Sequence, residues 1–173
     1  SEYFSSDGVA LPDKVTELEN FIIRAKELDP DFHCYPDVLD YISQAKDSDY
    51  RKGYLSKLTD NDLDNLLKTS LYPYQKEGIR FAFEKGKSII ADEMGLGKTV
   101  QAIGAAELLR KSGLVSSVFI VCPTSLKYQW QKEIERFTDS SAVVIEGNPI
   151  RRAQMYKEDA FYKIVSYHAM NRD

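Results

Sequence analysis

One stretch of this sequence joins two hydrophobic patterns through a turn with two glycines: Ile89-Ile90-Ala91-Asp92-Glu93-Met94-Gly95-Leu96-Gly97-Lys98-Thr99. The apolar run from Ser88 to Ala91 predicts a buried strand over residues 87–91. From Lys98 to about Lys111, apolar residues recur at helical spacing and predict a helix. A strand, a glycine turn and a helix in this order predict a phosphate-binding loop.

The chemistry of this loop follows from its residue types. Gly95 and Gly97 allow backbone angles that other residues avoid, and they let the main chain approach a ligand closely. The first N–H groups of the helix and its positive dipole end favour an anion. Lys98 would reach the terminal phosphates of a nucleotide, and the hydroxyl of Thr99 would hold Mg²⁺.

The match to the G-x-x-x-x-G-K-[ST] pattern is incomplete, because Asp92 stands where that pattern has its first glycine. The alternative interpretation is a Gly-Lys-Thr that occurs by chance at a helix start. The strand and the helix expected on either side favour the phosphate loop over that alternative.

The first 70 residues predict short helices and no strand. Residues 1–12 lack periodicity and are expected to form an irregular terminus, and Asp13 is expected to cap the first helix. The apolar face of that helix consists of Val15, Leu18, Ile22, Ala25 and Leu28. Pro36 starts a second helix, residues 47–52 predict a polar loop, and Thr59 opens a capping box before a third helix.

From residue 71 onward, helices and strands alternate. A helix from Pro73 to Gly86 precedes the phosphate loop, and three apolar runs after it predict strands at residues 118–122, 142–145 and 163–166. Helices are expected between these strands, beginning near Ser125 and at Asn148. This order predicts an α/β fold with a parallel sheet and right-handed crossovers, with the ligand beyond the carboxyl ends of the strands.

Composition argues against several classes of protein. The formal net charge is −4, which by itself does not indicate a nucleic-acid-binding protein. No apolar run approaches the ~20 residues that a membrane-spanning helix needs. The opening residues do not have the pattern of a signal peptide. Cys34 and Cys122 lack metal-binding or redox spacing and fit thiols of a reducing compartment.

Charge is distributed unevenly along the chain. Residues 1–70 carry 8 basic and 15 acidic side chains, whereas residues 71–173 carry 15 basic and 12 acidic ones. The first part is therefore acidic (−7) and the second mildly basic (+3). The alternative to a functional meaning is that both are solvated surfaces.

Four segments of residues 71–173 resemble motifs of Swi/Snf-type ATPases, a branch of helicase superfamily two, and they occur in the family's order. The first is the phosphate loop itself, Asp92–Thr99, whose acidic start is typical of that family. The others are the upstream Leu-Tyr-Pro-Tyr-Gln-Lys-Glu-Gly at 71–78, the Ile-Val-Cys-Pro-Thr-Ser-Leu at 120–126 with Gln-Trp at 129–130, and the Val-Ser-Tyr-His at 165–168.

The resemblance implies roles for particular residues. Gln75 would recognise the adenine base, Lys98 and Thr99 would be the catalytic residues of the loop, and Trp130 would either buttress the neighbouring loop or pack in the core. Four residues would contact DNA: Thr124, Ser125, Ser166 and Tyr167. The nucleotide would contact Gln75 together with Asp92, Glu93, Met94, Gly95, Leu96, Gly97, Lys98 and Thr99, with Thr99 on the metal.

The resemblance also implies a RecA-like lobe that uses ATP and Mg²⁺ and tracks double-stranded DNA, in a protein of the bacterial nucleoid or the eukaryotic nucleus. We expect residues 1–70 to be a helical segment of unknown role and residues 71–173 to be the front of lobe one. The acidic Asp-Glu strand-end motif and a second RecA-like lobe, acting in cis, would lie beyond Asp173, so this chain alone is expected to be inactive. The alternatives are a nucleotide-binding module of another class, such as a P-loop kinase, and a scaffold with a degenerate ATPase site.

Overall fold

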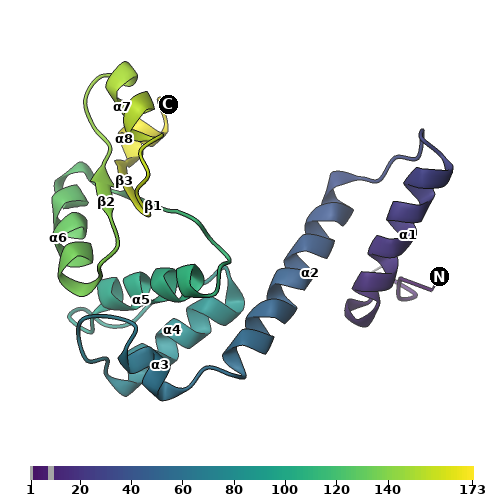
Figure 1. The fold of residues 1–173 in the computed structure, drawn as a ribbon, viewed down its shortest axis with the longest axis horizontal. Helices are drawn as coiled ribbons and strands as arrows, with labels where there is room; N and C mark the ends of the chain where they lie inside the picture. The colour runs from purple at the N-terminus through teal and green to yellow at the C-terminus, as the bar shows by residue number, and fades with distance from the viewer. Residues whose placement is uncertain (1, 8–9) are drawn as a thin grey trace. The chain divides into compact units, whose positions relative to one another are not determined.

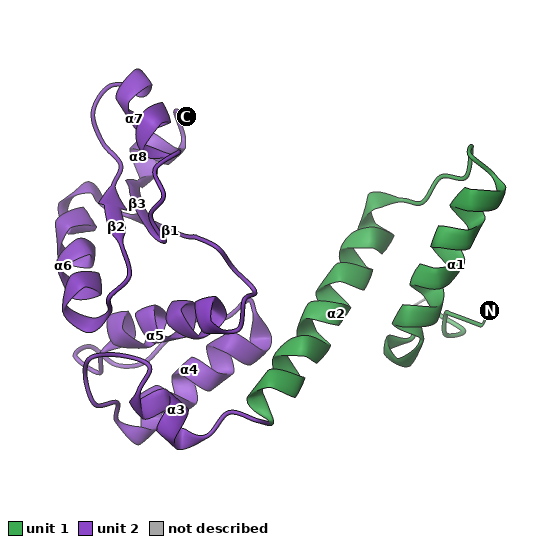
Figure 2. Cartoon of the chain, viewed as in Figure 1, with its two compact units in different colours: residues 1–56 green, residues 57–173 purple. Residues whose placement is uncertain are grey.

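A computed structural model describes residues 2–7 and 10–173, and the chain divides into two compact units, residues 1–56 and 57–173 (Figures 1 and 2). The segment between residues 57 and 70, which we expected to belong with the N-terminal helices, is part of the second unit. Its leucines explain this, because Leu63, Leu66 and Leu67 are buried there and the Lys68 amide donates to the Phe137 carbonyl.

The first unit is a pair of helices, α1 (Val15–Leu28) and α2 (Pro36–Leu55), preceded by a 3₁₀ turn at Pro12–Lys14. Both helices were expected. Their core consists of Val15, Leu18, Ile22 and Ile42. Of the segment expected to be irregular, residues 1, 8 and 9 lie outside the described part, while Phe4 and Ala10 form an antiparallel bridge.

Two local predictions in this unit are wrong. Asp13 does not cap α1, because it lies inside the 3₁₀ turn and the N-cap position is Lys14. The polar stretch at residues 47–52 is not a loop, because α2 continues through it. No Gly or Pro interrupts residues 37–52, so this polar segment remains compatible with a solvated helix.

The second unit begins with three helices: α3 (Asp60–Asp64), α4 (Pro73–Lys85) and α5 (Lys98–Lys111). The expected capping box at Thr59 is present, and Gly86 ends α4 as predicted. Helices α4 and α5 pack closely because Gly104 has no side chain. A Cβ atom there would lie 2.4 Å from Ile79 Cδ1.

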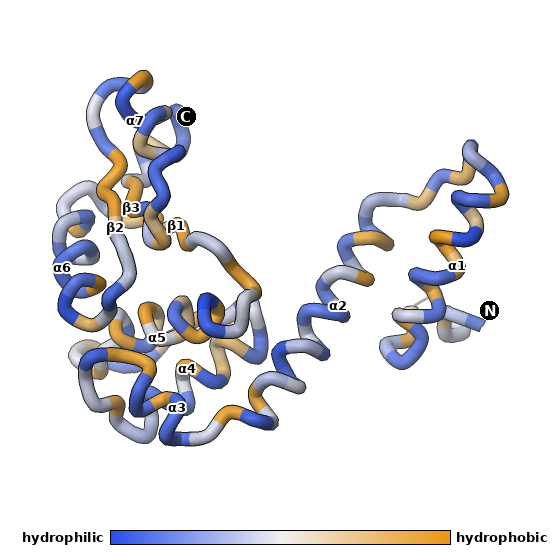
Figure 3. The backbone as a smooth tube through the Cα atoms, in the orientation of Figure 1, coloured by the Kyte–Doolittle hydropathy of each residue, from blue (hydrophilic) through white to orange (hydrophobic). Residues whose placement is uncertain are grey.

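The sheet has three parallel strands in the order β1-β3-β2: β1 (Val118–Cys122), β3 (Tyr162–Ser166) and β2 (Ala142–Val144). Strands β1 and β2 consist of hydrophobic residues (Figure 3). The predicted α/β class, the parallel pairing and these three strands are confirmed. Because the strands are parallel, their carboxyl ends meet at one edge of the sheet.

The first expected strand, at residues 87–91, is absent: this segment belongs to neither a strand nor a helix. Ile89 is 87% exposed. A strand requires a hydrogen-bonded neighbour, and the three-stranded sheet offers none to this segment. An apolar run alone does not supply that neighbour, so this prediction is wrong.

Three short helices complete the unit: α6 (Lys127–Phe137), α7 (Pro149–Met155) and α8 (Tyr167–Met170). Helix α6 packs against β2 and β3. Asn148 caps α7 as expected, whereas Ser125 does not cap α6. Instead, Ser125 lies in a 3₁₀ turn, Thr124–Leu126, between β1 and α6.

Candidate functional site

The phosphate loop, residues 92–99, owes its shape to two glycines in the left-handed backbone region. Gly95 has φ +86° and Gly97 has φ +76°, and Gly97 is the N-cap residue of α5. Gly97 is also required for space, because a Cβ atom there would lie 2.5 Å from Gln75 Nε2. The loop therefore leads directly into the N–H groups at the start of α5, an arrangement that suits an anion.

Lys98 folds back over this loop. Its Nζ donates to the carbonyl oxygens of Asp92 (2.8 Å) and Glu93 (2.9 Å). Lys98 and Thr99 are half-buried at the first turn of α5, whereas Met94 is 95% exposed and Glu93 and Leu96 are also exposed. The ammonium group is thus held at the loop, where a phosphate could accept its hydrogen bonds.

Gln75 joins the start of α4 to the phosphate loop. The Tyr72 amide donates to Gln75 Oε1 (3.1 Å), and Gln75 Nε2 donates to the Leu96 carbonyl (3.2 Å). The side chain is buried. Beside it, the exposed rings of Tyr72 and Tyr74 stack with centroids 5.8 Å apart, an aromatic pair that the sequence analysis did not single out.

A second buried glutamine, also missed from the sequence, holds the start of the loop. Gln101 Nε2 donates to Asp92 Oδ2 at 2.5 Å, and Gln101 is only 1% exposed. Gln101 is buried in α5 together with Ile103 and Gly104, and nothing in the local sequence distinguishes it from a solvated polar residue on a helix. Together Asp92 and Gln101 line a pocket of about 550 Å³ bordered by α4 and residues 89–91.

The residues expected to contact DNA follow two neighbouring strands. Thr124 and Ser125 are exposed just after β1, and Tyr167 is 54% exposed just after β3. Ser166 ends β3 opposite Cys122 of β1. It is buried, and its Oγ accepts from the Ala169 amide, so its hydroxyl caps α8.

Charges at the same edge are paired. Lys127, at the start of α6, is 5% exposed, and its Nζ lies 3.1 Å from Glu146 Oε2. The Tyr128 hydroxyl donates to Glu146 Oε1 at 2.9 Å. These two donors, Tyr128 first and then Lys127, lower the pKa of Glu146, and the bond to Glu146 raises the pKa of Tyr128.

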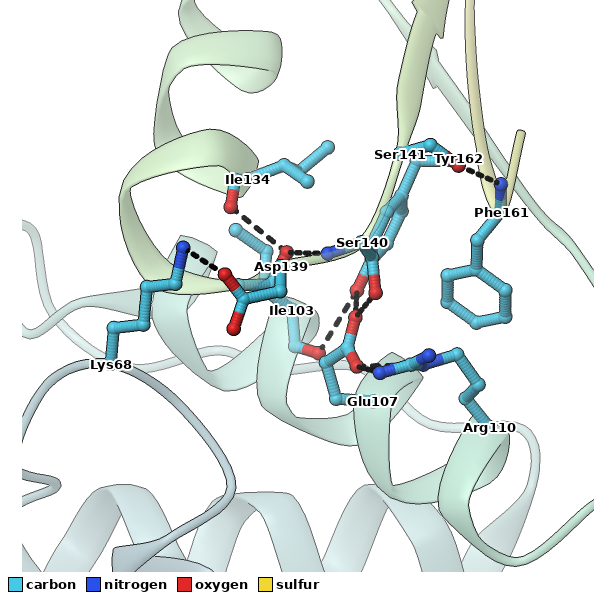
Figure 4. A network of polar contacts seen from close by, with 11 residues as sticks. Lys68, Ile103, Glu107, Arg110, Ile134, Asp139, Ser140, Ser141, Phe161 and Tyr162 are labelled. Atoms are coloured by element: carbon cyan, nitrogen blue, oxygen red, sulfur yellow. Dashed lines mark hydrogen bonds and ion pairs between the residues drawn. The ribbon is translucent and has the colours of Figure 1, made fainter.

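A buried polar network connects α5 to β3 (Figure 4). The Glu107 carboxylate, 2% exposed, accepts from the hydroxyls of Tyr162 (2.9 Å) and Ser140 (2.7 Å) and from Arg110 Nε (2.9 Å). Burial raises the pKa of Tyr162 far above its ordinary value, so its hydroxyl stays protonated and donates. The helix that starts at the phosphate loop is thereby tied to the strand that ends in Ser166.

The predicted site residues thus form two groups within the second unit. Hydrogen bonds join Gln75, Asp92 and Lys98 around the phosphate loop, and the strand ends gather Thr124, Ser125, Ser166 and Tyr167. His168, exposed on α8, and Trp130, half-buried on α6, belong to neither set of hydrogen bonds. Over residues 2–7 and 10–173, no three His, Cys, Asp or Glu side chains gather in a way that could hold a metal ion.

Among the described helices, none has the length and apolar character to cross a membrane.

Comparison with known proteins finds relatives over part of this chain. The chain is 46% identical over 83 residues to the human DNA annealing helicase and endonuclease ZRANB3, covering 46% of this chain and 7% of that protein. It is 37% identical over 129 residues to Helicase SWR1 of Debaryomyces hansenii, covering 68% of this chain and 8% of the relative. The chain thus spans under a tenth of the length of either relative.

A solved structure has the same fold. The Sulfolobus solfataricus SWI2/SNF2 ATPase core in complex with dsDNA matches with a TM-score of 0.55 and 30% sequence identity, covering 62% of this chain and 23% of that one. The parallel sheet is therefore of the RecA-like type found in that core. The model of the SNF2-related domain family matches residues 74–173, which include the phosphate loop and all three strands, and the chain belongs to this family of Swi/Snf-type ATPase domains.

Proposed function

We propose that this chain binds ATP with Mg²⁺ through the phosphate loop and is part of an ATPase that translocates on double-stranded DNA to remodel DNA or protein–DNA complexes. The observation that carries the proposal is the loop itself. Two glycines with left-handed backbone conformations lead directly into the N-terminus of α5. Lys98 is held over the loop by hydrogen bonds to two carbonyl groups.

The residues around the loop fit a nucleotide. The backbone of Gly95 to Gly97 and the first N–H groups of α5 would hold the phosphates, with Lys98 as the charged partner. Thr99 would contribute its hydroxyl to Mg²⁺, which offsets phosphate charge when bound. The Gly97 position supports this fit, because a side chain there would fill the space beside Gln75.

Gln75 is suited to the adenine edge. Its amide has two donor and two acceptor positions, and its bonds to Tyr72 and Leu96 occupy one of each. One N–H and one lone pair therefore remain for a base. The stacked rings of Tyr72 and Tyr74 next to it offer an aromatic surface on which a base could stack.

The residues that follow the ends of β1 and β3 would contact the DNA. Thr124, Ser125 and Tyr167 are exposed just after the paired ends of β1 and β3, and hydroxyl and backbone N–H groups are common phosphate ligands. Such contacts bind the backbone without reading sequence, which suits a protein that moves along a duplex. The similarity to proteins named as a helicase and as a DNA annealing helicase supports this proposal.

We expect this chain alone to show no DNA-stimulated ATP hydrolysis. Hydrolysis in this class needs an Asp-Glu strand end to hold Mg²⁺ and orient water. The three strands end instead in Val-Cys, Val-Val and Val-Ser. A protein that combined this lobe with such an acidic motif and a second lobe would supply what these strands do not.

Calorimetric titration of Mg-ATP into the chain tests the proposal. We expect a dissociation constant in the micromolar to millimolar range, which corresponds to a binding free energy of roughly −8 to −4 kcal/mol. Lys98→Ala should abolish measurable binding, while Lys111→Ala, at the exposed far end of the same helix, should bind like the unaltered chain. Equal binding by all three would remove Lys98 and this loop from the site.

A further inference from the structure

The phosphate loop is held at both ends by buried amide side chains. Gln75 binds the Leu96 carbonyl near its end, and Gln101 binds the Asp92 carboxylate at its start. The two glutamines come from different helices, α4 and α5. Asp92 carries a second link, because its carbonyl accepts from Lys98.

Helix α4 leaves room for the Gln101 amide at Gly78. A Cβ atom on Gly78 would lie 2.0 Å from Gln101 Oε1, well inside contact distance. Gly78 lies within the regular α4 helix, so available space explains this glycine and backbone conformation does not. The Gln101 side chain is therefore fixed between α4 and the start of the loop.

We propose that Gln101 is a positioning residue that keeps the phosphate loop in its nucleotide-binding conformation by holding Asp92, with Gly78 providing the space. The proposal rests on the proposed function, because it concerns ATP binding by this same loop. It also explains why Asp92 can stand where the general pattern has glycine: its carboxylate has a dedicated buried donor.

The mechanism is one of preorganisation. The Lys98 ammonium binds the carbonyl of the residue whose side chain Gln101 holds, so release of Asp92 would also shift the carbonyl that positions Lys98. A loop that spends less time in the binding conformation binds its ligand more weakly, in proportion to the lost population. For the loss of one hydrogen bond to a charged group, we expect that population to fall by roughly ten- to a hundredfold.

Exchanging donor and acceptor tests this directly in the complete 173-residue chain. Gln101→Glu opposes two carboxylates and should weaken Mg-ATP binding by roughly tenfold or more. Asp92→Asn keeps an acceptor for Gln101 and should cost less. In the double variant Asp92→Asn with Gln101→Glu, the amide introduced at position 92 can donate to the new carboxylate, so most of the lost affinity should return.

Two further variants separate positioning from a purely structural role. Gln101→Met removes the donor without burying a charge and should also weaken binding, with no rescue by Asp92→Asn. Gln44→Glu, on the exposed face of α2 in the other unit, is the matched control and should bind Mg-ATP like the unaltered chain. Hydrogen exchange gives a local readout: amides of residues 93–98 should exchange faster in Gln101→Met, while amides in the middle of α5 should not.

The outcomes are distinguishable. If the unaltered chain does not bind Mg-ATP, the proposed function fails. If it binds, and Gln101→Glu and Gln101→Met bind equally well, the positioning role is overturned. Weakened binding in both, with unchanged exchange in the loop and no recovery in the double variant, would also overturn it and assign Gln101 to general packing.

Discussion

The two units of this chain differ in charge and in the kind of contacts that they bury. Residues 1–56 carry 6 basic and 12 acidic side chains, and their core consists of four aliphatic residues. Residues 57–173 carry 17 basic and 15 acidic side chains. Four of their buried polar side chains each form a side-chain hydrogen bond: Gln75, Gln101, Glu107 and Lys127. Apolar periodicity alone specifies a fold in the first unit, whereas buried polar contacts in the second also specify a site.

If this contrast is correct, loss of a buried charge should produce the largest effect, and only in the second unit. Glu107→Ala removes the acceptor for Tyr162, Ser140 and Arg110. We expect a loss of about 3 kcal/mol in the free energy of unfolding of that unit. Urea unfolding followed by circular dichroism measures it, with the exposed Glu135→Ala expected within about 0.5 kcal/mol of the unaltered chain. A Glu107 variant as stable as the Glu135 control would show that the network is not structural.

The first unit should respond instead to loss of apolar volume. Ile42 is 4% exposed and packs against α1. Ile42→Ala should lower the free energy of unfolding by about 2–3 kcal/mol, the low end for such changes, since a two-helix core can relax around the cavity. Leu39→Ala, at a position 43% exposed, is the control. Mg-ATP binding should not change in either variant, and a change in Ile42→Ala would mean that the two units do not act independently.

Binding to duplex DNA should separate the two units by charge. The net charges are −6 for residues 1–56 and +2 for residues 57–173, so the first unit should oppose DNA binding by the second. We expect the complete chain to bind weakly and to lose affinity steeply with salt. Residues 57–173 alone should bind a few-fold more tightly at low salt. Equal affinities at low salt would indicate that the charge difference reflects only two solvated surfaces.

The smallest expected effect is on pH dependence. The folded-state pKa of Glu146 is lowered by Tyr128 and Lys127, so its contribution is present above the pKa of an unfolded carboxyl and is lost as pH falls through the lower folded value. Because the Glu146 side chain is 38% exposed, this contribution should be below about 1 kcal/mol. In the first unit, Glu17 raises the pKa of Lys14, so that contribution is lost only as pH rises through the raised value. Unfolding curves of Glu146→Gln and of the unaltered chain should therefore converge in acid, and a constant difference would argue against this pair.

The sequence was most informative where nearby residues alone restrict the backbone to one conformation. The phosphate loop was predicted because two glycines before Lys98 at a helix start leave few other conformations, and β1 because Val118–Cys122 is apolar on both faces. Residues 89–91 are also apolar, but whether they form a strand depends on a distant partner, which local sequence does not encode. Gln101 and Glu107 could not be predicted as buried, because a polar residue on a helix is ordinarily solvated and only tertiary packing distinguishes the exceptions.

The position of β3 between β1 and β2 has a consequence for synthesis. Neither outer strand pairs with the other, so the sheet cannot begin to form until the last of the three, Tyr162–Ser166, has left the ribosome. At roughly 5–20 residues per second, the apolar β1 would wait on the order of 2–9 seconds after its own emergence at Cys122. The helical first unit precedes the sheet in the sequence and would be complete well before then. We therefore expect the nascent second unit to be the stage at which this chain depends on chaperones.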